Sequence, residues 1–203
     1  AASKLGPVTI LVAGNGCDNV VNKAANLSGV AKTLVVDDPQ YTHALAETFT
    51  PLILNIINDY THVLAPATTF GKNLLPRVAA KLDVQQISEV IAIHDEKTFD
   101  RPIYAGNAIA TIQSNDPIKL LTVRATAFEA IDESESGSDI VYIESAENPK
   151  QSEFMSTELS KSDRPELTQA SIIISGGRGM QNGENFAMLE KVADILGAAV
   201  GAS

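Results

Sequence analysis

The chain has 203 residues, enough for one well-packed domain and part of a second, and its 44% apolar and 20% charged composition is ordinary for a globular protein. A net charge of −10 argues against a nucleic-acid binder and against attachment to an anionic membrane through basic residues. A single cysteine excludes a disulfide framework and a thiolate zinc site, and no apolar run approaches the ~18 residues that cross a bilayer.

The first part of the chain alternates between predicted strands and helices. Residues 1–6 end in a glycine and are typical of the last turn of a helix with a glycine cap. Strands are then predicted over residues 8–12, 33–36 and 62–66, and helices over 18–27 and 45–58. In the first helix, the residues expected to face the core are Val20, Val21, Ala24 and Ala25. The alternation predicts a three-layer α/β fold, Rossmann-like or nucleotide-α-hydrolase-like, with a mostly parallel sheet between helices.

The next part adds a helix and several strands. The helix follows the loop 67–73 and carries Pro76 in its early turns, and a strand is predicted over 87–94. Residues 103–113 and 118–126 flank a Ser-Asn-Asp-Pro turn, so they predict an antiparallel hairpin added to the parallel sheet. An acidic loop over 132–139, a short edge strand over 140–143 and a polar linker over 144–162 complete this region.

The last 33 residues form a strand, a glycine-rich turn, a helix and a second strand. The apolar run 172–174 is the first strand, the helix covers 185–196 and is stopped by Gly197, and the second strand covers 199–202. We therefore predict an N-terminal α/β domain over 1–159, and over 160–203 the first β-α-β unit of a second α/β domain.

The glycine-rich turn is the first candidate site. Gly176, Gly177 and Gly179 follow a strand directly, where glycines let the backbone turn tightly and approach a ligand closely. Arg178 lies among them and Ser203 follows the next strand, so both are expected at the strand ends, where α/β proteins bind ligands. The alternative is a tight turn with a solvated arginine, because the glycine spacing matches neither the dinucleotide fingerprint nor the phosphate-binding loop.

Three further candidates have simpler alternatives. Lys72 and Arg77 follow a loop of small residues that could bind an anion or nucleotide, although Thr68, Thr69 and Asn73 could simply cap the helix. Cys17 could be a thiolate at a helix N-terminus or an inert thiol. Asp37 and Asp38 could bind a metal or form a turn after their strand. No catalytic triad or paired-carboxylate arrangement stands out.

Four segments, taken in chain order, resemble the α subunit of electron-transfer flavoproteins. They are residues 70–82 (FGKNLLPRVAAKL), 101–108 (RPIYAGNA), 161–167 (KSDRPEL), and 175–179 (SGGRG) with 200–203 (VGAS). The second segment and its surroundings are closer to mitochondrial members of that family than to distant bacterial ones.

The resemblance implies a heterodimer with a β subunit, in which the first α domain is a scaffold and AMP is held by the β subunit. It implies FAD in the second α domain, with Arg178 and Ser203 as flavin-contacting positions within the turn of Gly176, Gly177 and Gly179. It also implies electron transfer from acyl-CoA dehydrogenases of fatty acid β-oxidation to a membrane-bound quinone oxidoreductase. The implied location is the mitochondrial matrix, or alternatively the bacterial cytoplasm.

The resemblance is partial at both ends of the chain. The family's first strand, ahead of Ala1, and nearly all of its FAD domain after Ser203 are not in this sequence. Two other hypotheses therefore stay open: a flavin-free α/β scaffold that acts through a partner protein, and a nucleotide-binding module that uses residues 68–73.

Overall fold

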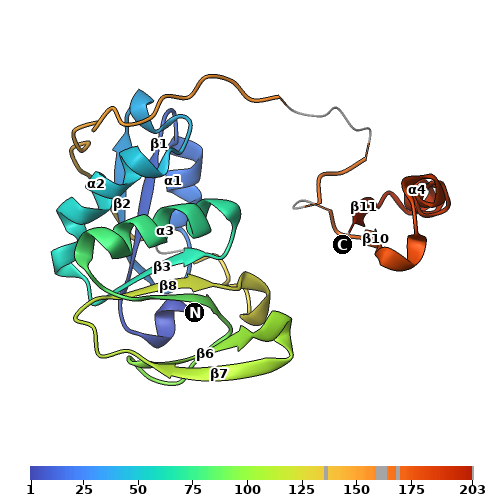
Figure 1. Cartoon of the computed structure of the whole chain (residues 1–203). Helices are drawn as coiled ribbons and strands as arrows, with labels where there is room; N and C mark the ends of the chain where they lie inside the picture. Colours follow the sequence, from blue (N-terminus) through green and yellow to red (C-terminus); the bar gives the residue numbers. More distant parts are fainter. Residues whose placement is uncertain (135–136, 159–163, 168–169, 203) are drawn as a thin grey trace. The chain divides into compact units, whose positions relative to one another are not determined.

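The computed structural model describes residues 1–134, 137–158, 164–167 and 170–202 (Figure 1). The chain divides into two compact units, Ala1–Phe154 and Met155–Ser203, each of which is described by itself. The predicted domain boundary between residues 159 and 160 stays a prediction, because both residues lie outside the described part of the chain.

A parallel sheet with the strand order β1-β2-β9 opens the first unit. Its strands are β1 (Val8–Gly14), β2 (Val30–Asp37) and β9 (Asp139–Tyr142), so the edge strand predicted near residue 140 is confirmed. Helix α1 (Asp18–Ala25) buries Val21, Ala24 and Ala25. The prediction for Val20 was wrong, since this side chain is 57% exposed: it lies about 100° around the helix from Val21, at the margin of the apolar stripe.

A second parallel sheet has the order β3-β8-β4, and it corrects one sequence prediction. Its strands are β3 (His62–Pro66), β8 (Lys119–Val123) and β4 (Gln86–Val90). Residues 118–126 were expected to form the antiparallel partner of 103–113, but β8 is instead the central strand of this parallel sheet. All five of its residues are buried, as is typical of a strand covered on both faces.

The structure does contain an antiparallel sheet, but it is built from other strands than the predicted pair. Strand β6 (Thr98–Ile103) pairs with β5 (Ala92–Ile93) and with β7 (Ala108–Gln113). The β6–β7 hairpin turns at η4 (Tyr104–Gly106), where all three residues have positive φ. The strand predicted over 87–94 is split into β4 and β5, because Glu89 has a φ of 59° and interrupts the register.

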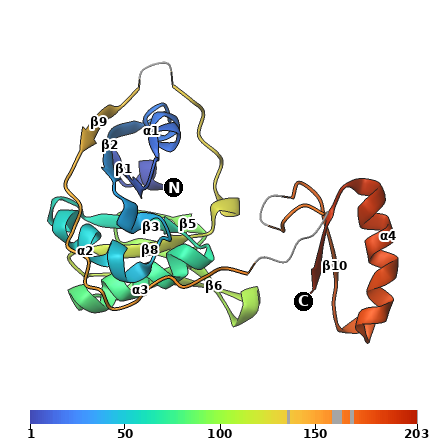
Figure 2. The same cartoon turned by 90° about the horizontal axis from the view of Figure 1, so that it is seen from above.

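Helices cover both faces of the β1-β2-β9 sheet, whereas the β3-β8-β4 sheet has α3 on one face and packs against Phe99 of β6 on the other. The predicted α/β fold with mostly parallel sheets is confirmed. Neighbouring side chains of β2 point in opposite directions: Val35 packs under α1, and Val36 packs under α2 (Ala46–Ile56) and α3 (Thr69–Leu82). Figure 2 shows α1 on one side of the strands, with α2 and α3 on the other. The short 3-10 turns of this unit are η1 (Ala2–Lys4), η2 (Pro39–Tyr41), η3 (Ile57–Asp59) and η5 (Ala125–Ala127).

The segment after β9 is tied to the first unit. The Ala146 amide donates to the hydroxyl of Tyr41 at 3.1 Å, and the Gln40 side chain donates to the Ala146 carbonyl at 3.1 Å. Further along, the ring of Phe154 stacks on His43 with centroids 3.7 Å apart. The first half of the predicted polar linker is therefore packed against the α/β unit.

The second unit is the predicted β-α-β opening. Strands β10 (Ile173–Gly176) and β11 (Ala199–Ala202) pair in parallel, and α4 (Phe186–Leu196) crosses between them after η6 (Arg178–Met180) and η7 (Gly183–Asn185). Gly197 ends α4 with a φ of 62°, as predicted. In the described part of the chain, no helix has the length and apolar character needed to cross a membrane.

Candidate functional site

Gly176 is the last residue of β10 and serves the packing of α4. A Cβ at this position would lie 2.7 Å from Leu189 Cδ1, 2.8 Å from Met180 Cγ and 2.9 Å from Phe186 Cζ. Any larger residue would therefore force these side chains, or the helix that carries two of them, to move. The glycine was expected to admit a ligand, whereas its visible role is close contact between helix and strand.

Gly177, Arg178 and Gly179 form the exposed part of the turn. Gly177 is extended, and the Arg178 carbonyl accepts a hydrogen bond from the Gln181 amide at 3.0 Å. The Arg178 side chain is exposed and has no ion-pair partner within the described residues. A Cβ at Gly179 would meet nothing within 4 Å, so the backbone there is open to an approaching group.

A shallow hollow of about 340 Å³ adjoins the turn. Its floor is held by Asn185, whose side chain donates to the Met180 carbonyl at 2.7 Å and whose amide donates to Asn182 Oδ1 at 3.3 Å. The residues lining the hollow are Gly179, Met180, Glu184, Asn185 and Met188. The turn thus presents a guanidinium that has no ion-pair partner in the described part of the chain, beside open backbone and an exposed methionine, Met188.

The register of β10 and β11 indicates where the chain leading to Ser203 leaves the sheet. Gly176 lies opposite Ala202 in the parallel pair, so β10 and β11 end at the same edge of the sheet. Ser203 itself lies outside the described residues, and its approach to Arg178 stays a prediction.

The described turn fits one part of an anionic dinucleotide cofactor. A planar, permanently charged guanidinium suits a pyrophosphate or an electron-rich ring, and glycines allow close backbone approach. The described residues offer a single cation and a small hollow, which can contact only a fraction of a molecule as large as FAD. The described residues of the turn can therefore form only one part of an FAD site.

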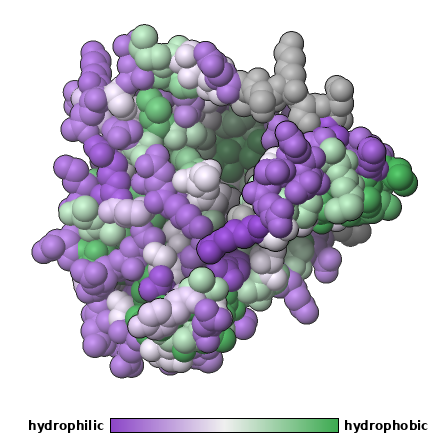
Figure 3. All heavy atoms as spheres, turned by 45° about the vertical axis from the view of Figure 1, so that its right-hand side comes forward, coloured by the Kyte–Doolittle hydropathy of each residue, from purple (hydrophilic) through white to green (hydrophobic). Residues whose placement is uncertain are grey.

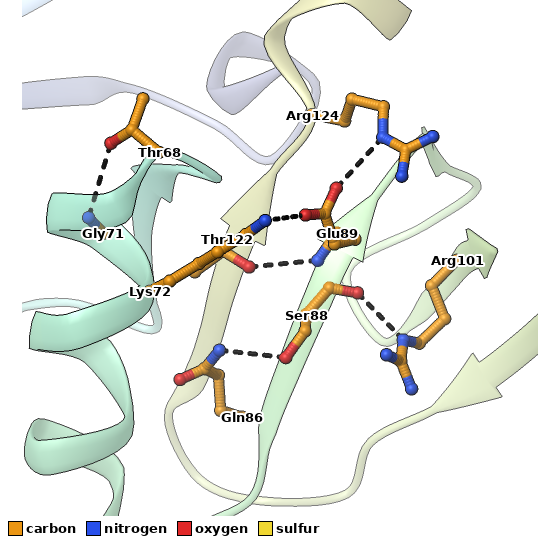
Figure 4. A network of polar contacts seen from close by, with 9 residues as sticks. All are labelled: Thr68, Gly71, Lys72, Gln86, Ser88, Glu89, Arg101, Thr122 and Arg124. Atoms are coloured by element: carbon orange, nitrogen blue, oxygen red, sulfur yellow. Dashed lines mark hydrogen bonds and ion pairs between the residues drawn. The ribbon is translucent and has the colours of Figure 1, made fainter. Parts of the chain in front are cut away.

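The second candidate, at the start of α3, is occupied by the protein's own groups. Thr68 Oγ1 accepts from the Gly71 amide at 3.4 Å and caps the helix. Lys72 forms an ion pair with Glu89, whose other carboxylate oxygen accepts from Arg124 Nε at 3.0 Å (Figure 4). Lys72 and Arg124 are thus both paired with the same carboxylate, which favours the capping alternative over an anion site.

Glu89 was not singled out from the sequence, although it organises this network. Its amide donates to Thr122 Oγ1 at 3.0 Å, and its positive φ turns the side chain toward Lys72 (Figure 4). The hydrogen bond from Lys72, followed by that from Arg124, lowers the pKa of the Glu89 carboxyl. A charged residue inside a predicted apolar strand was the signal that could have identified it.

Arg77 is also paired. It lies 3.6 Å from Glu47 Oε1 and donates to the Gln151 side chain, so it joins α3 to α2 and to the segment that follows β9. It is not available to a ligand at the start of α3.

The remaining candidates are structural. Burial, followed by the charge of Asp37, raises the pKa of the Cys17 thiol, which therefore stays protonated. Asp37 accepts from the amides of Gly16 (2.8 Å) and Cys17 (3.3 Å), and Asp38 accepts from Gln40 (3.0 Å). No group of three or more His, Cys, Asp or Glu side chains suited to a metal occurs within the described residues.

The structure is thus an α/β protein of two compact units, and the second unit has the strand–turn–helix–strand order that is common in ligand-binding α/β domains. The family model described as "Electron transfer flavoprotein domain" matches residues 1–149, and the "Electron transfer flavoprotein FAD-binding domain" model matches residues 166–203. The chain belongs to the electron transfer flavoprotein family, in its α-subunit branch.

Curated relatives cover the whole chain. It is 52% identical to the electron transfer flavoprotein subunit alpha of Pseudomonas aeruginosa, over 98% of this chain and 64% of that protein. It is 49% identical to the mitochondrial subunit alpha of Dictyostelium discoideum and 48% identical to the subunit alpha of Paracoccus denitrificans, over 100% of this chain in both cases and 62% and 66% of those proteins. The chain thus spans about two thirds of the length of these relatives.

Proposed function

We propose that this chain is the scaffold and the opening of the FAD domain of an electron carrier. With a β subunit, the complete subunit passes electrons from acyl-CoA dehydrogenases, as in fatty acid β-oxidation, to a membrane-bound quinone oxidoreductase. Membership of the electron transfer flavoprotein family supports this role, together with the match of residues 166–203 to an FAD-binding domain. When bound, FAD supplies the redox chemistry.

The observation that carries the proposal is Arg178, exposed on an open glycine turn and without an ion-pair partner among the residues that the structure describes. A fixed cation beside the flavin ring favours the negative charge that reduction places there, and its direct contact also helps to retain the cofactor. Gly177 and Gly179 permit close approach of the backbone, while Gly176 holds α4 against β10 and so keeps the turn in place. Ser203 is proposed as a second contact at the same sheet edge.

Replacing Arg178 tests this role in the complete subunit with its partner. Arg178→Ala is expected to lower FAD affinity about ten- to a hundredfold, because a charge-assisted hydrogen bond contributes ~1.5–3 kcal/mol. Arg178→Lys is expected to recover only part, since lysine keeps the charge but not the planar fork. FAD content after gel filtration and the midpoint potential in a reductive titration are the two readouts. Full FAD retention with an unchanged potential in the alanine variant would reduce Arg178 to a solvated turn residue.

The partner is proposed to pack on the first unit and to hold AMP. The resemblance to α subunits motivates this, and a β subunit is expected to co-purify with the complete chain at micromolar concentration. Arg178→Ala should leave that association intact, because the turn belongs to the other unit. A complete subunit that runs as a monomer, with no second chain, would contradict the proposed assembly.

The location is proposed to be the mitochondrial matrix, with the bacterial cytoplasm as the alternative. Relatives from Dictyostelium discoideum and Caenorhabditis elegans are named as mitochondrial, whereas that from Pseudomonas aeruginosa is bacterial.

A further inference from the structure

The chain contains two Asn-Gly dipeptides, Asn15-Gly16 and Asn182-Gly183, and the structure gives them different surroundings. In such a dipeptide the backbone nitrogen of the glycine can attack the carbonyl carbon of the asparagine side chain, because glycine has no Cβ that obstructs the approach. Both asparagines are exposed, so water reaches both of them. The difference lies in the nucleophile, which is the glycine nitrogen.

The Gly16 nitrogen is held by a charged acceptor. Its N–H donates to Asp37 Oδ1 at 2.8 Å, and the other oxygen of that carboxylate accepts from the Cys17 amide at 3.3 Å. This hydrogen bond must break before the nitrogen can attack, and the negative charge of the carboxylate opposes the loss of the proton. Gly16 also has a φ of 66°, so the fold itself requires a glycine there.

The Gly183 nitrogen has no such restraint. Its N–H has no acceptor within the residues that the structure describes. The side chain of Asn182 is folded over the backbone that follows it, because Asn182 Oδ1 accepts from the Asn185 amide at 3.3 Å. The side-chain carbonyl carbon of Asn182 therefore lies on the side of the Gly183 nitrogen, and the hydrogen bond polarises it toward attack.

No contact in the described structure requires a glycine at position 183. A Cβ there would meet nothing within 4 Å, and its φ lies outside the left-handed region, whereas a Cβ on Gly176 would collide with three side chains. Residues 181–185 are all exposed. Figure 3 shows hydrophilic surface, in purple, beside apolar surface, in green, on the second unit. The segment is thus open to the water that a hydrolytic reaction consumes.

We propose that Asn182 is a site of spontaneous deamidation, and that this reaction places a negative charge in the turn that carries Arg178. The Gly183 nitrogen loses its proton to hydroxide and forms a bond to Asn182 Cγ. The bond from Cγ to Nδ2 breaks, and the side-chain nitrogen takes up a proton from water and leaves as ammonia. Water then opens the cyclic imide at either carbonyl, which yields aspartate or isoaspartate.

The consequence for the turn rests on the proposed role of Arg178 in FAD binding. The Gln181 amide donates to the Arg178 carbonyl at 3.0 Å and the Asn182 amide donates to the Met180 carbonyl at 2.8 Å, so these residues form one short, tied segment. A carboxylate at position 182 repels the pyrophosphate of FAD and competes with it for the guanidinium. Isoaspartate also lengthens the backbone, which disturbs the bond between Asn185 and the Met180 carbonyl at the hollow.

Peptide mass spectrometry of the complete subunit with its partner, incubated at neutral and at mildly alkaline pH, tests the modification. Asn182 is expected to convert at least about tenfold faster than Asn15, whose neighbouring glycine must first break a hydrogen bond to a charged group. The conversion should quicken as the pH rises. Asn148 should stay unchanged, since the nitrogen of the following Pro149 carries no proton. Conversion of Asn182 no faster than that of Asn15 would overturn the proposal.

Gly183→Ala is the control variant for the nucleophile. Its methyl group fits the fold, because a Cβ at this position meets nothing within 4 Å, but it hinders the attack on Asn182. Most of Asn182 should therefore stay unconverted at a time when the wild type is largely converted, while the far-UV circular dichroism of the two proteins is the same. Conversion as fast as in the wild type would show that Gly183 is not the nucleophile and would also overturn the proposal.

FAD retention separates the modification from the proposed redox role. Asn182→Asp reproduces one of the two products and is expected to lower FAD affinity about three- to tenfold, measured as FAD content after gel filtration. Wild-type retention in this variant would refute the effect on the turn. The mass measurement involves no flavin, so a failure of the proposed role of Arg178 leaves the deamidation result as it stands.

Discussion

At the scale of single residues, the start of α3 and the glycine turn after β10 differ in whether their cationic side chains form ion pairs. Lys72 and Arg124 share Glu89, which is held by a backbone bond to Thr122 and has a pKa lowered by its partners. Arg178 is exposed and has no ion-pair partner within the described residues. A cation that is already paired must lose its partner before it binds a ligand, so the glycine turn is the better ligand site.

Protonation of Glu89 should weaken the first unit. Because the folded-state pKa lies below the usual 4.5, the network's stabilisation is complete above that value and is lost as the pH falls through the lowered pKa. We expect the unfolding free energy to begin to fall below about pH 5, with Glu89 contributing at most ~1 kcal/mol because Lys72 and Arg124 are about half exposed.

The measurement for Glu89 is urea unfolding between pH 7 and pH 3. Glu89→Gln should lower stability at pH 7 and flatten the acid decline, while exposed Glu129→Gln should change neither. An acid decline that is identical in wild type and Glu89→Gln would show that this network does not contribute.

At the scale of elements, helix α3 is placed against β3 by one glycine. A Cβ on Gly71 would lie 2.1 Å from the carbonyl oxygen of Pro66, the last residue of β3. The backbone oxygen cannot move away without shifting the strand end, whereas Thr68 caps the helix just before this contact. The glycine therefore sets the distance between strand and helix.

Gly71→Ala should cost more than about 2 kcal/mol of stability, because α3 or the end of β3 must move. Asn73→Ala, at an exposed position of the same helix, is the control and should stay within about 0.5 kcal/mol of wild type. Chemical denaturation followed by far-UV circular dichroism compares the two. A Gly71→Ala protein as stable as Asn73→Ala would mean that the strand end yields easily.

At the scale of the whole molecule, the second unit is incompletely covered. Ala193 of α4 is fully buried, whereas Ile173 of β10 is 49% exposed and Ile195 of α4 is 83% exposed. A two-stranded sheet with one helix offers too little core for an independent fold. The rest of the FAD domain is expected to cover these side chains.

The 203-residue chain by itself should therefore not retain FAD. The expected result is a colourless protein after incubation with FAD and gel filtration, whereas the complete subunit with its partner shows flavin absorbance. Intact-mass measurement confirms which chain is being tested. Stoichiometric FAD on a verified 203-residue chain would place the flavin site outside the predicted domain.

The sequence by itself determined the alternation of strands and helices, the glycine stop of α4, and the positions of β1, β3 and β9. It also identified the family, through segments such as residues 70–82. These are local properties: apolar periodicity, turn residues and short motifs depend on neighbours within a few positions. The same reasoning weighed Thr68 as a cap and Cys17 as an inert thiol against functional readings, and the structure favours the structural alternatives.

Only the tertiary structure decided how these pieces combine. Residues 118–126 are compatible with a hairpin strand, but β8 lies between β3 and β4, whose residues are far from it in sequence. Glu89 contacts Lys72 and Arg124, which belong to other elements. Gly176 packs closely against side chains of α4, which come later in the chain than the glycine turn. Each of these features depends on contacts between distant segments, which local periodicity cannot specify.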